Sequence, residues 1–289
     1  MPSTREIRRR IKGVKNIRQV TRAMNMIAAA RLRRAQTKAE AARPYADRLR
    51  AILQDVLASG ASGRHPLLAQ RPVRKIGIVV VSSDRGLCGS FNAGILREAG
   101  RFAEEQTADV GLITVGRKAR EFFQRMELAI DQPFPQPSRD VRLEEVGAIS
   151  KQIISDYTTG KYDQIQLVYA QFISILKSSP RVIQLLPIPK PSDNAAASHG
   201  VSYQFEPEAE ELLGTLLPQY VEVLMYGALV ESLASEQAAR MVAMKAATDS
   251  ASDMIDTLTR QYNRVRQTAI TTSILEVVSG AEALADSEH

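Results

Sequence analysis

One stretch of the chain has the residue types of a phosphate-binding or catalytic loop. Residues 82–92, SSDRGLCGSFN, follow an apolar run typical of a buried strand and precede a helical pattern. A glycine-rich turn between a strand and a helix can hold phosphate with backbone N–H groups. However, the stretch matches neither GxGxxG nor GxxxxGK(S/T), and it contains no lysine. We therefore interpret it first as a tight turn or partner-docking loop, and second as a nucleotide site.

The single cysteine, Cys88, lies in this loop and could act as a nucleophile. A nucleophilic thiol needs an adjacent base. The three histidines, His65, His199 and His289, lie in or beside predicted loops or at the C-terminus, so the sequence places none next to Cys88. We interpret Cys88 as a small buried apolar residue, and the scarcity of histidine and cysteine argues against a zinc site. We expect no catalytic residue, metal or cofactor.

Charge is segregated between the two ends of the chain. Residues 1–50 hold 15 Lys and Arg against 3 Asp and Glu, whereas residues 206–289 hold 5 against 14. Opposite charges favour contact between the two ends, although two solvated helical faces would give the same composition. The basic end could also bind nucleic acid, but its first 40 residues contain no aromatic side chain for stacking on bases.

Both ends have the apolar spacing of helices that pack along another helix. Within residues 5–58 the expected seam consists of Ile7, Ile11, Val14, Ile17, Val20, Met24 and Ile27. Near the C-terminus it consists of Met241, Met244, Thr248, Ala251, Ile255, Leu258, Tyr262, Val265 and Ala269. This spacing predicts a coiled coil. A helix from Pro218 to Ala285 would be about 100 Å long, so we expect it to protrude or to pass through a partner.

The middle of the chain alternates strand and helix patterns. Strands are expected at 75–81, 109–115, 164–170, 182–188 and 201–205, and helices at 92–106, 117–125 and 141–159. Such alternation predicts an α/β layer with a mostly parallel sheet. The predicted fold class is therefore α/β: a Rossmann-like domain at 70–206, inserted between coiled-coil helices at 1–60 and 209–289 that pair in an antiparallel way.

Two further features bear on location. No run approaches 18 consecutive apolar residues, and the first ten residues, MPSTREIRRR, lack an apolar signal segment. We expect neither a membrane span nor export from the compartment of synthesis.

Two prolines bear on the long helices. Within the first helix, Pro44 predicts a kink or local break. Pro218 suits the first position of the last helix.

Four stretches resemble one family. They are IKGVKNIRQVTRAMNMIAAARLRRAQ at 11–36, VSSDRGLCGSFN at 81–92, SEQAARMVAMKAATDSA at 235–251 and VRQTAITTSILEVVSGAEAL at 265–284. In order and over the whole chain, they closely resemble the gamma subunits of F-type ATP synthases, in a bacterial form. The match is far more specific than any single motif.

The resemblance implies a central rotor shaft. In this family the terminal helices turn inside a ring of three alpha and three beta subunits, and the α/β domain lies beside the epsilon subunit on the membrane c-ring. Proton-driven rotation moves the catalytic beta subunits through their conformations during ATP synthesis or hydrolysis. The resemblance implies a non-catalytic subunit with no small-molecule substrate and no nucleic acid partner. It implies a peripheral position on the cytoplasmic face of the bacterial plasma (inner) membrane, in the F1 sector.

The family pattern also implies which residues contact the alpha–beta ring. Met24 corresponds to the position where the first helix meets an acidic lever loop of the beta subunits. The corresponding positions for a catch loop are Arg266, Gln267, Thr271 and Glu276. The family commonly has an acidic residue where this chain has Ser273, so a carboxylate contact is not expected there.

Two other function classes remain open from the residues alone. One is a nucleotide-dependent α/β enzyme with a coiled-coil handle, with its site at 82–92. The other is a basic coiled-coil nucleic-acid binder that uses residues 5–38. With one cysteine, the chain is not expected to carry the thiol regulation of some photosynthetic relatives.

Overall fold

The computed structural model describes residues 3–58, 65–137, 141–189 and 209–287. Its contacts group the chain into two compact units. Residues 1–27 with 241–289 form what we call the helical unit, and residues 28–240 form the α/β unit. Two helices supply residues to both, namely α1 (Thr4–Ala58) and α5 (Ala209–Ser287).

The α/β unit contains a five-stranded sheet in the order β3-β2-β1-β4-β5. The strands are β1 (Lys75–Val81), β2 (Asp109–Val115), β3 (Ile130–Phe134), β4 (Gln164–Ser174) and β5 (Lys177–Leu186). All pairs except the antiparallel β4–β5 are parallel. The order of the first four matches a doubly wound sheet, so the predicted mixed α/β fold with a mostly parallel sheet is confirmed.

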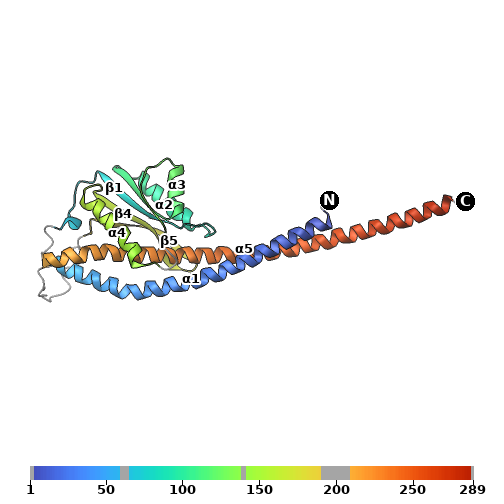
Figure 1. Cartoon of the computed structure of the whole chain (residues 1–289), viewed down its shortest axis with the longest axis horizontal. Coiled ribbons are helices and arrows are strands. Elements are labelled where there is room, and N and C mark those ends of the chain that lie inside the picture. Colours follow the sequence, from blue (N-terminus) through green and yellow to red (C-terminus); the bar gives the residue numbers. More distant parts are fainter. Residues whose placement is uncertain (1–2, 59–64, 138–140, 190–208, 288–289) are drawn as a thin grey trace. The chain divides into compact units, whose positions relative to one another are not determined.

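Helices cover both faces of this sheet (Figure 1). One face packs against α4 (Leu143–Thr158), the first part of α5 and the end of α1, and a short 3₁₀ helix (Pro66–Leu68) joins this core. The other face packs against α2 (Phe91–Glu104) and α3 (Arg117–Arg125). Because alternate side chains of a strand point to opposite faces, Val79 belongs to the first core and Val80 to the second. Burial on both sides explains the continuous apolar run in β1.

Two strands differ from expectation, and one expected strand is not tested. The strand β3, IDQPF, was not predicted, since it is short, contains Pro133 and lacks a β-branched run; as an edge strand it tolerates the proline. The strand expected at 182–188 begins earlier, at Lys177, because β4 and β5 form an antiparallel hairpin. The strand expected at 201–205 lies outside the described residues.

The two prolines in the long helices also differ from expectation. The helix α5 begins at Ala209, nine residues before Pro218, because Leu213 and Leu217 pack into the core at helical spacing. The predicted start at Pro218 is therefore wrong. The helix α1 continues through Pro44 to Ala58, so the alternative of a helix break is also wrong.

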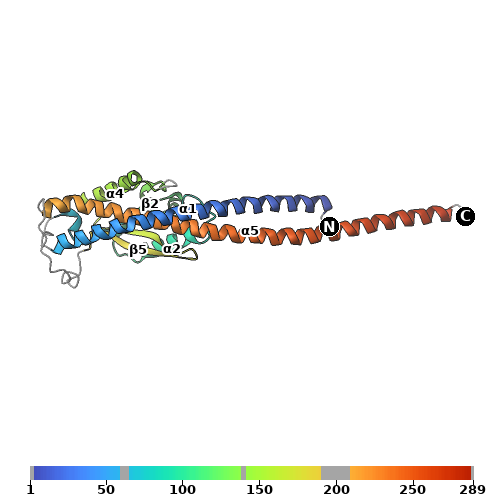
Figure 2. The same ribbon diagram turned by 90° about the horizontal axis from the view of Figure 1, so that it is seen from below.

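In the helical unit, α1 and α5 run antiparallel side by side (Figure 2). Three contacts set the alignment. Arg8 donates to the Tyr262 hydroxyl at 2.5 Å, the Thr248 and Thr21 hydroxyls lie 2.8 Å apart, and the Asn25 amide donates to the Met241 carbonyl at 2.7 Å. No salt bridge joins the two helices within the described part of this unit, so the charge segregation produces no direct pairs there.

The predicted seam of α5 is confirmed from Met241 to Val265. Met244, Ala251 and Ile255 are buried, and the remaining seam positions in that range are half-buried. Ala269 is exposed, contrary to expectation. The reason is the antiparallel alignment: Arg8 lies at the level of Tyr262, so Ala269 lies beyond the level of Thr4, where α1 begins.

The predicted seam of α1 is wrong at Ile17, Val20 and Ile27, which are each more than half exposed, whereas Met24 is half-buried. The covered positions instead continue in strict steps of four and three through Arg18, Thr21, Asn25 and Ala28. Two polar residues of this seam, Thr21 and Asn25, have hydrogen-bond partners on α5, and such residues fix the register of a helix pair.

By length and mean hydropathy, one window within Glu210–Ser279 of α5 could cross a membrane. In the structure 39% of that window is buried within the protein. The core helix of a soluble protein meets the same criterion, so this match is weak evidence for a span. The expectation of no membrane span was based on unbroken apolar runs, whereas this window meets the criterion by its mean hydropathy.

Candidate partner-contact surface

Met24 lies on α1 in the helical unit and is half-buried beside the seam. Its neighbour Asn25 is held by the hydrogen bond to Met241, which fixes the rotation of this part of α1. Val20 and Ile27 flank Met24 at helical spacing and expose 57% and 54% of their surface. Met24 therefore borders an exposed apolar strip formed by Val20 and Ile27. From the apolar spacing alone, both residues were expected in the seam.

The other four predicted contact residues lie on α5 beyond its seam with α1. Arg266, Gln267, Thr271 and Glu276 are all exposed. The Thr271 hydroxyl donates to the Gln267 carbonyl at 3.0 Å, a bond within the helix. Among the described residues, no other side chain forms a hydrogen bond or ion pair with Arg266, Gln267 or Glu276. Their polar groups are therefore available to a partner.

The structure does not bring all five predicted residues together. With 3.6 residues per turn, Gln267 and Thr271 lie about 40° apart on α5, whereas Glu276 lies about 180° from Gln267. Because Thr21 lies beside Thr248 in the antiparallel pair, Met24 lies near the level of residue 245 on α5. At 1.5 Å per residue, Arg266 is roughly 30 Å farther along that helix. The five residues therefore do not form one site. Met24 lies apart on α1, Gln267 and Thr271 share one face of α5, and Glu276 lies on the opposite face. Arg266 lies between these two faces, about 100° from Gln267 and about 80° from Glu276.

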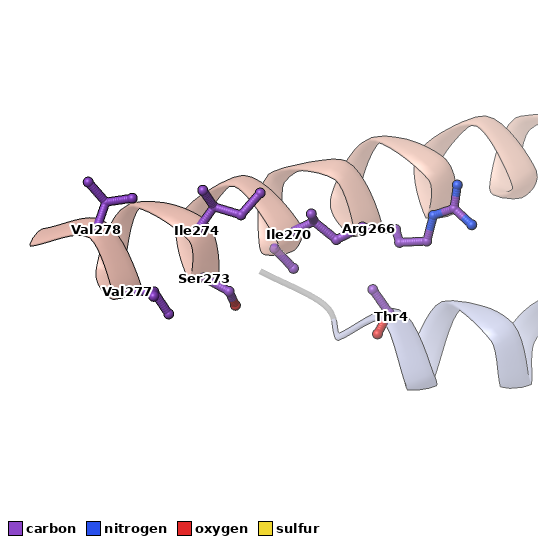
Figure 3. Close-up of a pocket in the computed structure, with 8 residues that line it drawn as sticks. Thr4, Arg266, Ile270, Ser273, Ile274, Val277 and Val278 are labelled. Atoms are coloured by element: carbon purple, nitrogen blue, oxygen red, sulfur yellow. The ribbon is translucent and has the colours of Figure 1, made fainter. Parts of the chain in front are cut away.

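An apolar groove lies between the start of α1 and the last turns of α5 (Figure 3). It has a volume of about 540 Å³. Its lining consists of Thr4, Arg266, Ala269, Ile270, Ser273, Ile274, Val277 and Val278. Sequence reasoning missed this strip, although the apolar spacing of Ile270, Ile274 and Val277 continues the helical pattern. Arg266 is thus a cation at the edge of an exposed apolar surface.

The loop at 82–92 is closed by its own hydrogen bonds. The backbone N–H groups of Ser83 and Asp84 donate to the side chains of Asn92 and Gln136. The N–H of Arg117, which begins α3, donates to the Asp84 carboxylate at 2.8 Å. Two backbone N–H groups that could bind a phosphate at the start of the loop are therefore already occupied. This geometry favours the turn or docking interpretation over a nucleotide site.

Cys88 is 2% exposed, as the apolar interpretation predicts. Burial raises the pKa of its thiol; the nearby Arg240 guanidinium opposes this shift. The thiol therefore stays protonated and shielded from solvent, which does not suit a nucleophile. Within the described ranges, no group of three or more His, Cys, Asp or Glu side chains could hold a metal ion.

Comparison with known proteins decides the family. The family model described as ATP synthase matches residues 3–284. The ATP synthase gamma chain of Desulfitobacterium hafniense is 45% identical over 284 residues, which cover 98% of this chain and 100% of that relative. The chain belongs to the ATP synthase gamma-chain family. The gamma chain of Heliobacterium modesticaldum is 46% identical over 290 residues, with 98% and 100% covered.

Solved structures agree with the gamma-chain fold. A chain in the central stalk and c-ring of the Tetrahymena thermophila mitochondrial ATP synthase has a TM-score of 0.62 at 26% identity, covering 79% of this chain and 99% of that one. A chain in the Euglena gracilis mitochondrial OSCP/F1/c-ring assembly has a TM-score of 0.67 over 99% of this chain and 96% of its own. At 16% identity, this second likeness supports the fold alone.

Proposed function

We propose that this gamma chain is the central rotor shaft of a proton-translocating ATP synthase. It would couple rotation of a membrane c-ring to the conformational cycle of catalytic beta subunits, during synthesis or hydrolysis of ATP. The observation that carries the proposal is the family match over residues 3–284, which includes both helices and the α/β layer. The exposed strips on α1 and α5 supply surfaces that a surrounding ring could contact.

The mechanism requires contacts that change with angle. A shaft with the same surface on all sides would bind each beta subunit equally and could not favour one conformation over another. On this chain, the faces of α5 differ: Ile270 lines the apolar groove with Arg266 at its edge, whereas Glu276 lies outside the groove. Rotation would present these faces in turn to each beta subunit, and differences in contact energy would shift its conformational equilibrium.

Five residues are proposed to make these contacts: Met24, Arg266, Gln267, Thr271 and Glu276. Met24 would meet an acidic lever loop, beside the exposed Val20 and Ile27. Gln267 and Thr271 share a face and would contact one catch loop together, whereas Glu276 would act at a different rotor angle. Charge-assisted hydrogen bonds, donated by Arg266 and accepted by Glu276, would be strong and directional, which suits contacts that depend on angle.

We further propose the assembly and location of the subunit. Its partners would be three alpha and three beta subunits, the epsilon subunit and the c-ring. It would be non-catalytic and peripheral, in the F1 sector on the cytoplasmic face of a bacterial plasma membrane. The functional division would be a coiled-coil helix at 1–60, an inserted α/β domain at 70–206 and a coiled-coil helix at 209–289.

Reconstitution tests the rotor function. The complete complex in membrane vesicles should hydrolyse ATP and pump protons, and the complex assembled without this chain should lose proton pumping. The full chain alone should bind neither ATP nor DNA at low salt. Fully coupled turnover by a complex lacking the chain would contradict the proposal.

A substitution at Met24 tests the contact on α1. Met24→Lys places a cation where an acidic loop is proposed to pass, and the new attraction should hold the rotor at one angle. We expect normal assembly but reduced proton pumping per ATP. Arg22→Lys, on an exposed position of the same helix, is the control. Normal pumping and hydrolysis by Met24→Lys would exclude this contact.

A further inference from the structure

The α/β unit contains a buried ion pair that the proposed ring contacts do not use. Glu236 and Arg240 lie one turn apart on α5, with side chains only 5% and 9% exposed. The Arg240 Nη1 and Glu236 Oε1 atoms are 2.5 Å apart. Removing two charges from water costs free energy, which good pairing and hydrogen bonding must offset. A buried ion pair is therefore weak evidence that its role is to stabilise the fold. Its other partners indicate a further role.

Glu236 is linked to two segments that follow strands of the sheet. The Gln136 amide, just after β3, donates to Glu236 Oε2 at 2.6 Å. The oxygen of the same amide accepts the backbone N–H of Asp84, just after β1, at 2.8 Å. One glutamine therefore bridges the end of β1 and the shaft helix α5.

Arg240 and Asp84 complete the connection. The second guanidinium nitrogen of Arg240 donates to the carbonyls of Arg85 and Gly86, at 3.5 and 3.3 Å. Asp84 accepts from Arg117 at the start of α3, directly after β2. The carboxyl ends of β1, β2 and β3 are thus all connected through hydrogen bonds to a single turn of α5.

These contacts are directional, whereas the surrounding apolar contacts are not. Apolar packing fixes how far a helix lies from a sheet, but the hydrophobic effect that drives it has no directional preference. Hydrogen bonds weaken steeply when their angles change, so a polar cluster also fixes the rotation. The α/β unit ends at Arg240, and α5 continues from Met241 in the helical unit. The cluster therefore holds α5 at the last turn before it leaves the α/β unit.

We propose that Gln136, Glu236 and Arg240 form a torsional latch that locks α5 to the sheet and transmits torque into the shaft. The inference rests on the proposed rotor function, and it assigns to these residues a positioning role rather than contact with the ring. Without the latch, α5 would twist under load before the ring responded. Rotation of the α/β unit would then be only partly converted into work on the beta subunits.

Two variants in the complete complex test the latch. Glu236→Gln keeps the shape but removes the charge, and Gln136→Leu removes the bridge but leaves the ion pair. We expect both to assemble and to hydrolyse ATP, with a partial loss of protons pumped per ATP in membrane vesicles. In a single-molecule assay, the rotor should twist further under a given torque. Gln136→Asn shortens the bridge by one methylene and should cause a smaller loss of protons pumped per ATP. It replaces the other two variants in the test if they fail to assemble.

Tyr162→Phe is the matched control. It removes a buried hydrogen bond, from the Tyr162 hydroxyl to Asp131, that lies in the same unit but does not involve α5. It should lower thermal stability and leave coupling and torsional stiffness unchanged. If it reduces coupling as much as the latch variants, or if the latch variants retain normal stiffness, the latch is excluded. Failure of the unmodified complex to couple would instead contradict the rotor function itself.

Discussion

The α/β unit and the helical unit differ in how much of their apolar surface is buried. In the α/β unit both faces of the sheet are covered, and residues such as Ile153 and Phe123 are completely buried. In the helical unit a single narrow seam is covered, while Ile17 and Ile274 each expose 58% of their surface. The α/β unit also exposes single apolar residues, such as Leu176, whereas in the helical unit exposed apolar residues recur at helical spacing along both helices. Exposed apolar surface of this extent is typical of interaction sites.

The largest expected contrast concerns two glycines. Gly116, in the α/β unit, has φ +96°, and a Cβ there would lie 2.3 Å from the Ser82 carbonyl oxygen. Gly116→Ala should therefore destabilise the chain by about 4 kcal/mol or more. Gly13, in the exposed part of α1, has no neighbouring atom within 4 Å of the place that a Cβ would occupy, so Gly13→Ala should stabilise by about 0.5–1 kcal/mol. Urea unfolding of the full chain measures both, and effects of equal sign would contradict the contrast.

A second contrast compares two isoleucines. Ile153→Ala removes a fully buried side chain from the core of the α/β unit and should cost about 3 kcal/mol. Ile274→Ala removes an exposed one and should change stability by less than about 0.5 kcal/mol. Only Ile274→Ala should weaken the affinity of the chain for the alpha–beta ring. Unfolding curves and a binding titration distinguish the two effects; a large stability loss with Ile274→Ala would mean that its face is covered within the chain.

The polar seam of the helical unit predicts a smaller, non-additive effect. Thr21→Val removes the hydroxyl partner of Thr248 and should cost about 1 kcal/mol. Adding Thr248→Val makes both positions apolar and should recover most of that loss. A double-mutant cycle followed by thermal unfolding tests this. Purely additive losses would indicate that the two hydroxyls do not interact.

The smallest effect concerns acid stability. Backbone N–H groups of Arg74 and Lys75 donate to the Asp163 carboxylate and lower its pKa below the usual value. Because the pKa is lower in the folded state, Asp163 stabilises the fold above pH about 4, and this contribution is lost as the pH falls through the folded pKa. Asp163→Asn should flatten that part of the pH–stability curve. An unchanged acid slope would contradict this assignment.

The sequence was a good guide where a pattern depends on local spacing. Strand β1 was predicted at its observed bounds, 75–81, because burial on both faces leaves a continuous apolar run. The α5 seam was predicted because its apolar residues have only one consistent register. In α1, Val14 is followed by Ile17 three residues on and Arg18 four residues on. The partner helix, not the apolar pattern, decides that Arg18 continues the seam.

Long-range polar contacts could not be predicted. Glu236 and Arg240 look like surface charges in the sequence, and Gln136 lies 100 residues from Glu236. Their burial follows from where the strand ends converge. The contact residues on α5 came from family resemblance, and the chain alone adds that Glu276 lies on a different face from Gln267. The apolar strip at Ile270 and Ile274 was missed, although its spacing is visible in the sequence beyond the predicted seam.

Rotation of this chain inside an alpha–beta ring is the most direct test. Cys88 is the only cysteine of the chain and is buried, whereas Leu176, at the tip of the β4–β5 hairpin, is 86% exposed. Leu176→Cys therefore allows a probe to be attached at one place on the α/β unit, with cysteine-free alpha and beta subunits fixed to a surface. The rotor function predicts that ATP drives the probe in one direction through full turns. A probe that stays still while the ring hydrolyses ATP at its normal rate would contradict it.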